Sequence, residues 1–580
     1  MMTHFIISKS NNTSGQYQIP LTANWVLSLQ NDQYTEYIDN DIKIIIIGDY
    51  IGDKATLFSC ELDDIPKLKG NFYAIIVKRN NIRVYTSFFN VMPIYYTLDK
   101  AYISSSIAYI TEYSQRDFSV DKKFILESLL FNYGFFNRTF YKEIQLLPCH
   151  HFLTLDDTEV SLQSHFETTS LYTKHPTKGS KVVDHLSDLF IKTTKQYLPD
   201  THFDIAFTSG FDGRTLVSCA THFKKDFKTF SFGKPENADV AVPRANAKEL
   251  NIEYRYFDLS HEEYVKKYFH TNAKEYIHHA PGGNGFIYAH FLHSTKEIAK
   301  KADHLLSGVV GSELFRALHL TGAVTSQALA DIFTSKSASE LKDNITNSPT
   351  LEVIQKEEFA VELEELIEEL IAYKDSLDKE LTLNQQFYIF VFEEIFRKFF
   401  GQWISTQMQY IKVRTPFLDY HFIKALLQTQ YAGANNDFFT ENPLKRIKGQ
   451  YLYTDIIKKT NKKIYHQKTG KGYRPKDVRE SIYLYKIILP FVLKRFKRKV
   501  KTPNLDNLGI ISGVLAHKKD HQSLLDHASY FDQDKLKKML NTLSPYTKEK
   551  ERDTLLMVLS ILSGLQNKAE TKSKNSYHYE

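Results

Sequence analysis

The first third of the chain carries the pattern of an antiparallel β-sheet. Between Ile42 and about Leu155, short runs of β-branched and aromatic residues, such as IKIIIIG (42–48) and NFYAIIV (71–77), are separated by Asn, Gly, Asp and Pro. Runs of this length with these breaks are typical of strands joined by tight turns. We therefore expect a strand-rich first domain.

A different rhythm starts near Val182. The amphipathic segment VVDHLSDLFIKTTKQYL (182–198) precedes the apolar run FDIAF (203–207), and a helical pattern follows it directly. Strands that alternate with helices at this spacing predict a parallel α/β sheet. From Ser326 to about Gln430 the pattern is nearly all helical, so the second domain is expected to have a large helical part.

Length and composition limit the class of protein. At about 100–200 residues per domain, 580 residues predict two to four domains. A formal charge of +6 on such a chain does not indicate a nucleic-acid partner. The three cysteines, Cys60, Cys149 and Cys219, are far apart, which excludes zinc spacings and favours a reducing, cytoplasmic compartment. We expect neither a secretory signal nor a transmembrane segment, because no run reaches about 18 uncharged apolar residues.

Three segments have unusual charge. The acidic stretch 357–370 predicts one solvated helix with Phe359, Leu363, Leu366 and Leu370 turned inward. The basic stretch 482–501 suits an interfacial helix, a site for an acidic partner, or a packed helix with a solvated basic end. The composition of 568–580 predicts a disordered tail.

The strongest local signal for chemistry is FDIAFTSGFDGRTLVS (203–218). A buried strand ends at Phe207, a polar turn follows, and a helix starts near Arg214. Amides at the helix start, glycines that allow close approach, hydroxyls and an acid that can hold magnesium would together make a phosphate site. The residues in question are Thr208, Ser209, Gly210, Asp212 and Gly213. A tight connection with a capping Asp is the alternative.

Several segments resemble the asparagine synthetase family in order and spacing. FTSGFDGR (207–214) resembles that family's pyrophosphate loop LSGGLDSS, and LLSGVVGSELF (305–315) resembles LSGDGGDELF. VRTPFLDYHFIKALL (413–427) resembles VRVPFLDHRLVEFA, and HQKTGKGYRP (466–475) resembles RPKMGFGVP. In the first domain, residues 70–96 and 139–155 resemble segments of the class II glutamine amidotransferase domain. The resemblance covers about residues 40–475.

The resemblance implies two domains with different chemistry. Residues 1–165 would form an amidotransferase-like domain of antiparallel β-sheet layers flanked by helices. Residues 180–475 would form an adenine-nucleotide hydrolase-like α/β domain that adenylates a carboxylate with ATP and Mg²⁺, releases pyrophosphate and lets an amine attack. Residues 476–567 would form a helical, basic extension.

The resemblance also implies roles for single residues. The pyrophosphate and magnesium would be held by Thr208, Ser209, Gly210, Phe211, Asp212, Gly213 and Arg214. The adenosine would lie against Phe232, Ser307 and Gly308. Lys468 would stabilise the transition state, unless it is only an exposed lysine in a turn.

Departures from the family pattern restrict the function. The chain begins Met1-Met2-Thr3-His4, without the terminal cysteine that attacks glutamine, so we expect glutaminase chemistry to be lost unless the true start differs. Thr3 is the nearest hydroxyl that processing would uncover. In the synthetase half, Ser312 replaces a magnesium-binding Asp and Val309 replaces a polar group, whereas Glu313 remains as a metal ligand.

Three functions therefore compete. The leading hypothesis is an amide ligase without glutaminase, similar to β-lactam synthetases and lasso-peptide cyclases, acting on a small-molecule or peptide carboxylate in natural-product, peptide or polysaccharide modification. The alternatives are an asparagine synthetase that takes ammonia or glutamine and an inactive nucleotide-binding scaffold. The resemblance admits a homodimer. The pairs His150-His151 and His278-His279 are expected at the surface, and the Gly-rich stretch 280–288 is expected to be a flexible loop near the acceptor.

Overall fold

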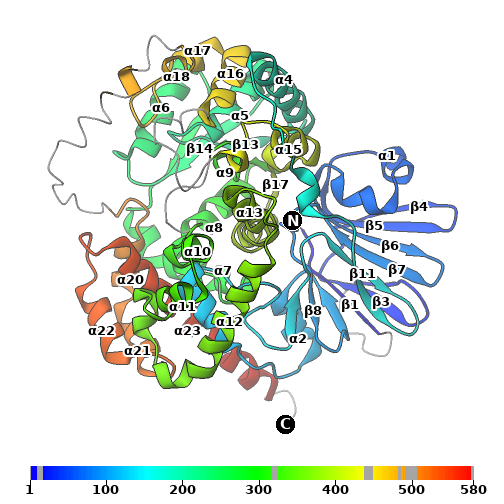
Figure 1. Cartoon of the computed structure of the whole chain (residues 1–580), viewed down its shortest axis with the longest axis vertical. Helices are drawn as coiled ribbons and strands as arrows, with labels where there is room; N and C mark the ends of the chain where they lie inside the picture. Colours follow the sequence, from blue (N-terminus) through cyan, green and yellow to red (C-terminus); the bar gives the residue numbers. More distant parts are fainter. Residues whose placement is uncertain are drawn as a thin grey trace.

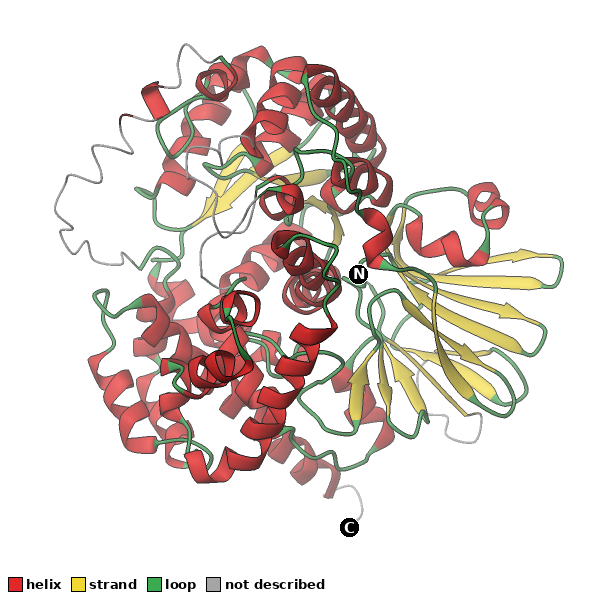
Figure 2. Cartoon of the chain, in the orientation of Figure 1, coloured by secondary structure: helices red, strands yellow, loops and turns green. Residues whose placement is uncertain are grey.

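The computed structural model describes residues 2–9, 17–316, 324–436, 449–480, 485–487, 489 and 506–576, with side chains up to residue 566. An N-terminal strand-rich domain packs beside a larger domain dominated by helices (Figures 1 and 2). Most of the basic stretch 482–501 lies outside the described residues. In the part of the chain that is described, no helix is long and apolar enough to cross a membrane.

The N-terminal domain contains two antiparallel sheets of six strands each, ordered β10-β8-β9-β1-β3-β2 and β12-β11-β7-β6-β5-β4. The prediction of an antiparallel first domain is confirmed, and the domain starts earlier than Ile42. Its strands and helices are β1 (Phe5–Lys9), β2 (Tyr17–Pro20), β3 (Trp25–Leu29), β4 (Thr35–Asp39), β5 (Ile42–Tyr50), β6 (Gly70–Lys78), β7 (Asn81–Thr86), β8 (Tyr95–Thr97), β9 (Tyr102–Ser104), β10 (Ile144–Leu146), β11 (His151–Leu155), β12 (Val160–Ser164), α1 (Lys54–Ser59), α2 (Ile107–Ser114) and α3 (Lys122–Phe131).

Strand β5 explains why the first predicted strand is a continuous apolar run. Ile45 and Ile47 belong to the core cluster that extends through both domains, whereas Ile44 and Ile46 belong to a second cluster, to which Leu57 of α1 contributes. Successive side chains of a strand point to opposite faces. Because both faces of β5 are covered, its sequence does not alternate.

The second domain is built on a parallel sheet ordered β15-β14-β13-β16-β17, as the alternating pattern predicts. Strand β13 lies between β14 and β16, so the chain leaves it toward one side of the sheet and later returns on the other. Open α/β sheets bind ligands at the carboxyl ends of strands where the order reverses in this way. The elements of this part are α4 (Ser180–Tyr197), β13 (Phe203–Ala206), α5 (Asp212–His222), β14 (Lys228–Phe232), α6 (Ala238–Leu250), β15 (Tyr254–Phe257), α7 (Phe269–His279), α8 (Gly285–Ala299), β16 (His304–Leu306) and β17 (Lys412–Arg414).

Helices make up most of the remaining described chain, as predicted for 326–430. In the acidic stretch, Phe359, Leu366 and Leu370 are buried and Leu363 is half-buried. The longer helices are α10 (Gln327–Thr334), α11 (Ala338–Thr346), α12 (Ala360–Ser376), α13 (Leu383–Phe390), the π-helix η6 (Val391–Phe400), α14 (Gly401–Met408), α15 (Tyr420–Leu427), α16 (Tyr451–Thr460), α20 (Ile510–Ala516), α21 (Lys518–Asp526), α22 (Gln533–Thr542) and α23 (Glu549–Ser576). Shorter turns of helix are η1 (Leu62–Lys67), η2 (Thr168–Leu171), η3 (Tyr264–Tyr268), α9 (Gly311–Phe315), η4 (Pro349–Val353), η5 (Lys356–Phe359), η7 (Pro416–Leu418), η8 (Gly433–Asn435), α17 (Lys462–His466) and α18 (Pro475–Arg479).

Helix α23 runs to Ser576, inside the segment for which we expected a disordered tail. Two smaller predictions are wrong. His150 is not at the surface but is buried, with its ring 4.5 Å from that of Phe88. The stretch around Gly282 is a packed turn, because a Cβ there would lie 2.2 Å from the ring of Phe124.

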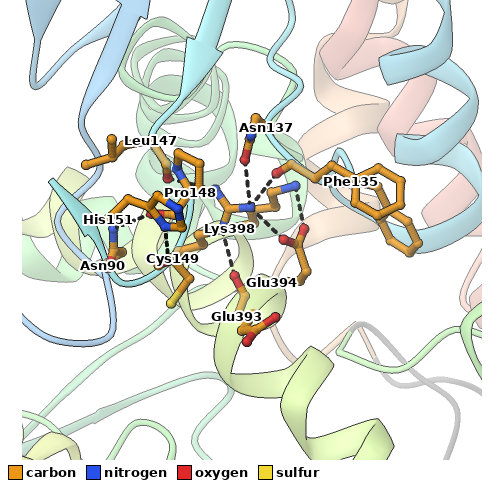
Figure 3. A network of polar contacts seen from close by, with 12 residues as sticks. Asn90, Phe135, Asn137, Leu147, Pro148, Cys149, His151, Glu393, Glu394 and Lys398 are labelled. Carbon is orange, nitrogen blue, oxygen red and sulfur yellow. Dashed lines mark hydrogen bonds and ion pairs between the residues drawn. The ribbon is translucent and has the colours of Figure 1, made fainter. Parts of the chain in front are cut away.

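A buried charged network joins the two domains. Arg397 of η6 donates to the carbonyl oxygen of Leu147 at 2.9 Å and to the Glu394 carboxylate at 2.5 Å. The Lys398 ammonium lies 2.7 Å from Glu394 Oε2. Figure 3 shows Glu394 and Lys398 beside Leu147 and its neighbours from the N-terminal domain. The ion pairs lie within η6, and the two domains are linked by the hydrogen bonds of Arg397 to the carbonyl oxygens of Leu147 and Phe136.

A second attachment lies beneath the parallel sheet. Arg414, at the end of β17, forms a two-point ion pair with Asp49 of β5, with nitrogen–oxygen distances of 2.6 and 3.0 Å. Asn71 of β6 donates its side-chain amide to the carbonyl oxygen of Val413 at 2.8 Å. The edge strand β17 is thus anchored to the N-terminal domain.

Candidate nucleotide site

Two loops meet at the carboxyl ends of β13 and β16. Residues 207–211 lead from β13 into α5, and residues 307–310 lead from β16 into α9. A Cβ on Gly308 would lie 2.7 Å from Asp212 Cβ, and a Cβ on Gly213 would lie 2.1 Å from the carbonyl oxygen of Ala206. Gly213 lets α5 start directly against the end of β13, and Gly308 lets the loop after β16 contact Asp212 at the start of α5.

Asp212, the first residue of α5, lies at the centre of this junction. Tyr453 of α16 donates its hydroxyl to Asp212 Oδ1, and Ser312 of α9 donates to Oδ2 at 3.2 Å. Burial raises the pKa of the Asp212 carboxyl above its ordinary value, although the charge of Arg316 and these hydrogen bonds oppose the shift. The carboxylate is therefore held in place by neutral donors without an ion-pair partner among the described residues.

Glu313 provides a second carboxylate close to Asp212. Burial and the negative charge of Asp212 raise its pKa to about 7. Asp212 and Glu313 are half-buried, and two like charges shielded from solvent in this way are unfavourable together unless a cation lies between them. Magnesium needs only one or two protein carboxylates when phosphates supply further oxygens. Asp212 and Glu313 fit such a site, whereas the described residues contain no cluster of three or more His, Cys, Asp or Glu that could hold a metal by itself.

The turn at 466–475 folds over the loop that follows β13. The backbone N–H of Gly470 donates to the carbonyl oxygen of Ser209 at 3.1 Å. Arg214, which is fully buried, donates to the carbonyl oxygens of Gly210 at 3.3 Å and Lys468 at 3.0 Å. The turn and the loop therefore form one unit, clasped by Arg214.

Several residues expected at the site lie differently from the prediction. Ser209 donates its hydroxyl to Asp239 of α6 at 2.6 Å, so this hydroxyl is engaged within the chain. The Phe211 ring is buried and stacks on Tyr453, with 5.7 Å between ring centroids. Only the backbone of Phe211 is available to a ligand. Burial lowers the pKa of Arg214 to about 10, and its contacts lie behind the loop.

Three of the other expected residues, Thr208, Phe232 and Ser307, lie at the carboxyl ends of β13, β14 and β16. Thr208 is half-buried, and a Cβ on Gly210 would meet only its hydroxyl, at 3.5 Å, so the loop surface there is open. The Phe232 ring, at the end of β14, lies 5.2 Å from the ring of Phe291. Ser307 accepts a hydrogen bond from the N–H of Val309 at 3.3 Å, and Lys468 is exposed.

Three residues at this site were missed by the motif comparison. Tyr453 contacts Asp212, and Arg316 directly follows α9. Desolvation and, to a smaller extent, the charge of Arg316 lower the pKa of Lys471. Tyr453 lies in an ordinary amphipathic helix, so no local pattern marks it. An arginine one residue beyond SELF was visible in the sequence and is the one signal that was available.

Comparison with known proteins identifies the family of the second domain. A family model described as asparagine synthase matches residues 186–566. The chain belongs to the asparagine synthase family. The match includes α20–α23, beyond the segments whose motifs we compared. Members of this family are ATP-dependent enzymes that form amides.

Other comparisons add little. A search of curated proteins finds no match. Among solved structures, a glutamine phosphoribosylpyrophosphate (PRPP) amidotransferase from B. subtilis complexed with ADP and GMP aligns with 9% identity over 59% of this chain and 83% of that chain, with a TM-score of 0.18. At that score the alignment carries no structural argument.

Proposed function

We propose that this asparagine synthase family member is a carbon–nitrogen ligase that adenylates a substrate carboxylate and transfers the acyl group to an amine. The observation that supports this most directly is the position of Asp212. It begins a helix at the reversal point of a parallel sheet, beside Glu313 and under the turn that contains Lys468. Helix N-termini and oriented amides favour phosphate groups at such a place.

The proposed reaction has two steps. A carboxylate oxygen of the substrate attacks the α-phosphorus of ATP, the α–β anhydride bond breaks, and pyrophosphate leaves. The amine then attacks the acyl carbon, its bond to AMP breaks, and the amine nitrogen loses a proton. Activation is needed because a free carboxylate is a poor electrophile, and fixed cations and amides stabilise the charge that moves onto pyrophosphate.

The chain's own residues divide this work. Thr208, Gly210 and Gly213 would present the loop to the phosphates, Asp212 and Glu313 would hold Mg²⁺, and Phe232, Ser307 and Gly308 would border the adenosine. Bound magnesium would neutralise phosphate charge. Lys468, at the exposed side of the clasped turn, would lie near the reacting carboxyl.

We further propose that the N-terminal domain is a scaffold without glutaminase activity. Burial raises the pKa of the Cys60 thiol, raises that of Cys149 well above its ordinary range and raises that of Cys219 to about 12, so none is an activated thiolate. Thr3 is also unsuited to attack. It is buried, and its hydroxyl donates to the carbonyl oxygen of His4 and accepts from the N–H of Asn31.

The proposed substrates are a carboxylate on a small molecule or peptide and an amine that belongs to a substrate, in natural-product, peptide or polysaccharide modification in the cytoplasm. Asparagine synthesis from ammonia is a second candidate, which the family membership favours. A third, an inactive nucleotide-binding scaffold, is favoured by Val309 and Ser312 in the second loop.

Pyrophosphate release tests the proposal. The full-length protein, incubated with MgATP and a panel of amino acids, short peptides and sugar acids, is expected to release pyrophosphate and AMP with at least one of them. Asp212→Ala and Lys468→Ala should abolish the release, whereas Asp226→Ala and Lys463→Ala, at exposed positions of the same domain, should not. Binding of ATP without release for every carboxylate would favour the scaffold instead.

Glutamine distinguishes the remaining alternatives. Incubation with glutamine should produce no glutamate, and aspartate with ammonia should produce no asparagine. Appearance of glutamate would contradict the scaffold role of the N-terminal domain. Appearance of asparagine would assign the ordinary reaction of the family.

A further inference from the structure

We propose that Arg316 binds the diphosphate of the nucleotide and supplies positive charge that a second metal ion would otherwise bring. This inference rests on the proposed function, because it assigns a residue to the same nucleotide site. The resemblance described above implies a metal-binding acid at the position where this chain has Ser312. With one acid fewer, the site can bind fewer magnesium ions, although the negative charge of the departing pyrophosphate is the same. Another cation is then needed to neutralise it.

The main chain at Arg316 is fixed at the edge of the site. Tyr388 of α13 donates its hydroxyl to the carbonyl oxygen of Glu313 at 2.6 Å and to that of Arg316 at 2.9 Å. Gly449 packs against the same side chain, since a Cβ there would lie 2.7 Å from Arg316 Cγ. The stem of the arginine is therefore held between α13 and the chain that enters α16.

The guanidinium lies close to the acids of the site without pairing with them. Burial lowers the pKa of Arg316, but the interactions with Tyr453, Asp212 and Glu313 raise it by more, so the net shift is upward. Nevertheless, Arg316 forms no ion pair with a described acid, and its buried Nε has no hydrogen-bond partner there. A buried guanidinium in this state is costly unless a ligand completes its hydrogen bonds.

A bound phosphate would pair with the guanidinium of Arg316 and with a cation held by Asp212 and Glu313. The planar guanidinium can bind two phosphate oxygens at once. Asp212 and Glu313, whose charges act on Arg316, would hold one magnesium ion, which would supply further positive charge to the phosphates. Lys471, which Arg316 influences electrostatically, adds a second cation at this edge.

A second arginine shows why the assignment falls on Arg316. Arg214 belongs to the loop motif and is the obvious candidate from sequence. However, Arg214 donates to the carbonyl oxygens of Gly210 and Lys468, so it is already used to clasp the turn. Of these two arginines, Arg316 is the one whose Nε lacks a hydrogen-bond partner among the described residues.

Binding of inorganic pyrophosphate, measured by calorimetry on the full-length protein with and without Mg²⁺, tests the inference. Arg316→Met should weaken pyrophosphate binding about 10–100-fold, the range expected for lost hydrogen bonds to a charged group, and Arg316→Lys should restore part of it. Arg116→Met, which removes an exposed arginine of the N-terminal domain, should leave binding unchanged. Unchanged binding in Arg316→Met, at normal thermal stability, would overturn the assignment.

The double variant Ser312→Asp/Arg316→Met tests the exchange of charge. Adding the acid back should recover pyrophosphate binding only when divalent metal is present. It should also raise the number of Mn²⁺ ions bound with pyrophosphate from one to two, counted by electron paramagnetic resonance. No gain in bound Mn²⁺ would contradict the idea that arginine replaces a metal ion.

These measurements do not depend on turnover. If the wild-type protein binds pyrophosphate through Arg316 but releases none from ATP with any carboxylate, the inference holds and the proposed ligase activity fails. If pyrophosphate is released but Arg316→Met binds it normally, the ligase stands and the role of Arg316 is wrong.

Discussion

Two regions of this protein treat buried or half-buried charges in opposite ways. Where the domains meet, Arg397 and Lys398 pair with Glu394 within η6, Arg397 donates to the carbonyl oxygen of Leu147, and Arg414 pairs with Asp49 of the other domain. At the nucleotide site, Asp212, Glu313 and Arg316 lie close together without forming an ion pair within the described chain. Pairing offsets the cost of desolvation, so the first set stabilises the fold. The charges of the second set are not paired, so their desolvation cost is offset only when a ligand binds, as is common at binding sites.

The largest effect on stability is expected at the interdomain network. Arg397→Met leaves Glu394 with one cation and removes the donor from the carbonyl oxygen of Leu147. Breaking a buried charge pair from one side lowers the free energy of unfolding by about 3–5 kcal/mol. Urea denaturation should show this loss, whereas Arg83→Met, at a more exposed ion pair, should change stability by less than about 0.5 kcal/mol. A similarly small change for both variants would show that the network does not hold the domains together.

The anchor beneath β17 is expected to have the next largest effect. Asp49→Asn keeps the shape of the side chain but removes the charge that Arg414 faces. Arg414 retains some contact with solvent, at 13% side-chain exposure, so the expected loss is smaller, about 2–3 kcal/mol. Because Ser307 donates its N–H to the carbonyl oxygen of Arg414, pyrophosphate release should fall as well. An unchanged rate would show that the second loop is positioned without this anchor.

The same anchor gives a pH dependence with a definite sign. Burial alone would raise the pKa of Asp49, but contacts with His304 and Arg414 bring it well below the ordinary value. The carboxyl is then a stronger acid in the folded chain than in the unfolded one, so the pair stabilises the fold above about pH 4 and this contribution is lost at lower pH. The stability difference between the wild type and Asp49→Asn should be full at pH 7 and shrink below pH 4. A difference that is constant over this range would mean that charge at Asp49 is not the cause.

How much of this could be read from the sequence depends on whether a feature is local. The strand, the polar turn and the helix predicted between 203 and 218 are local and are present in this order, although the strand ends at Ala206 and the helix starts at Asp212, two residues before Arg214. The clasp by Arg214 and the contact of Tyr453 with Asp212 join residues more than two hundred positions apart. Spacing in one sequence cannot reveal such contacts. Ion pairs also form between residues far apart in the sequence. The motif therefore identified Asp212 as charged but did not indicate whether a cation neutralises it.

The smallest effect on stability is expected at the nucleotide site, and it should have the opposite sign. Asp212→Asn keeps an oxygen that can accept from Tyr453 and places an amide toward the Ser312 hydroxyl, which can accept in turn. It also removes one of two like charges, so without ligand the variant should be as stable as the wild type or more stable by up to about 1 kcal/mol. Pyrophosphate release should nevertheless be lost, because the magnesium ligand is gone. Urea denaturation in EDTA, compared with the same titration in MgATP, checks both parts. The wild type should gain stability from MgATP and the variant should not. If Asp212→Asn instead destabilised the ligand-free protein as strongly as Arg397→Met does, the charge at Asp212 would be structural, and the contrast between the two regions would fail.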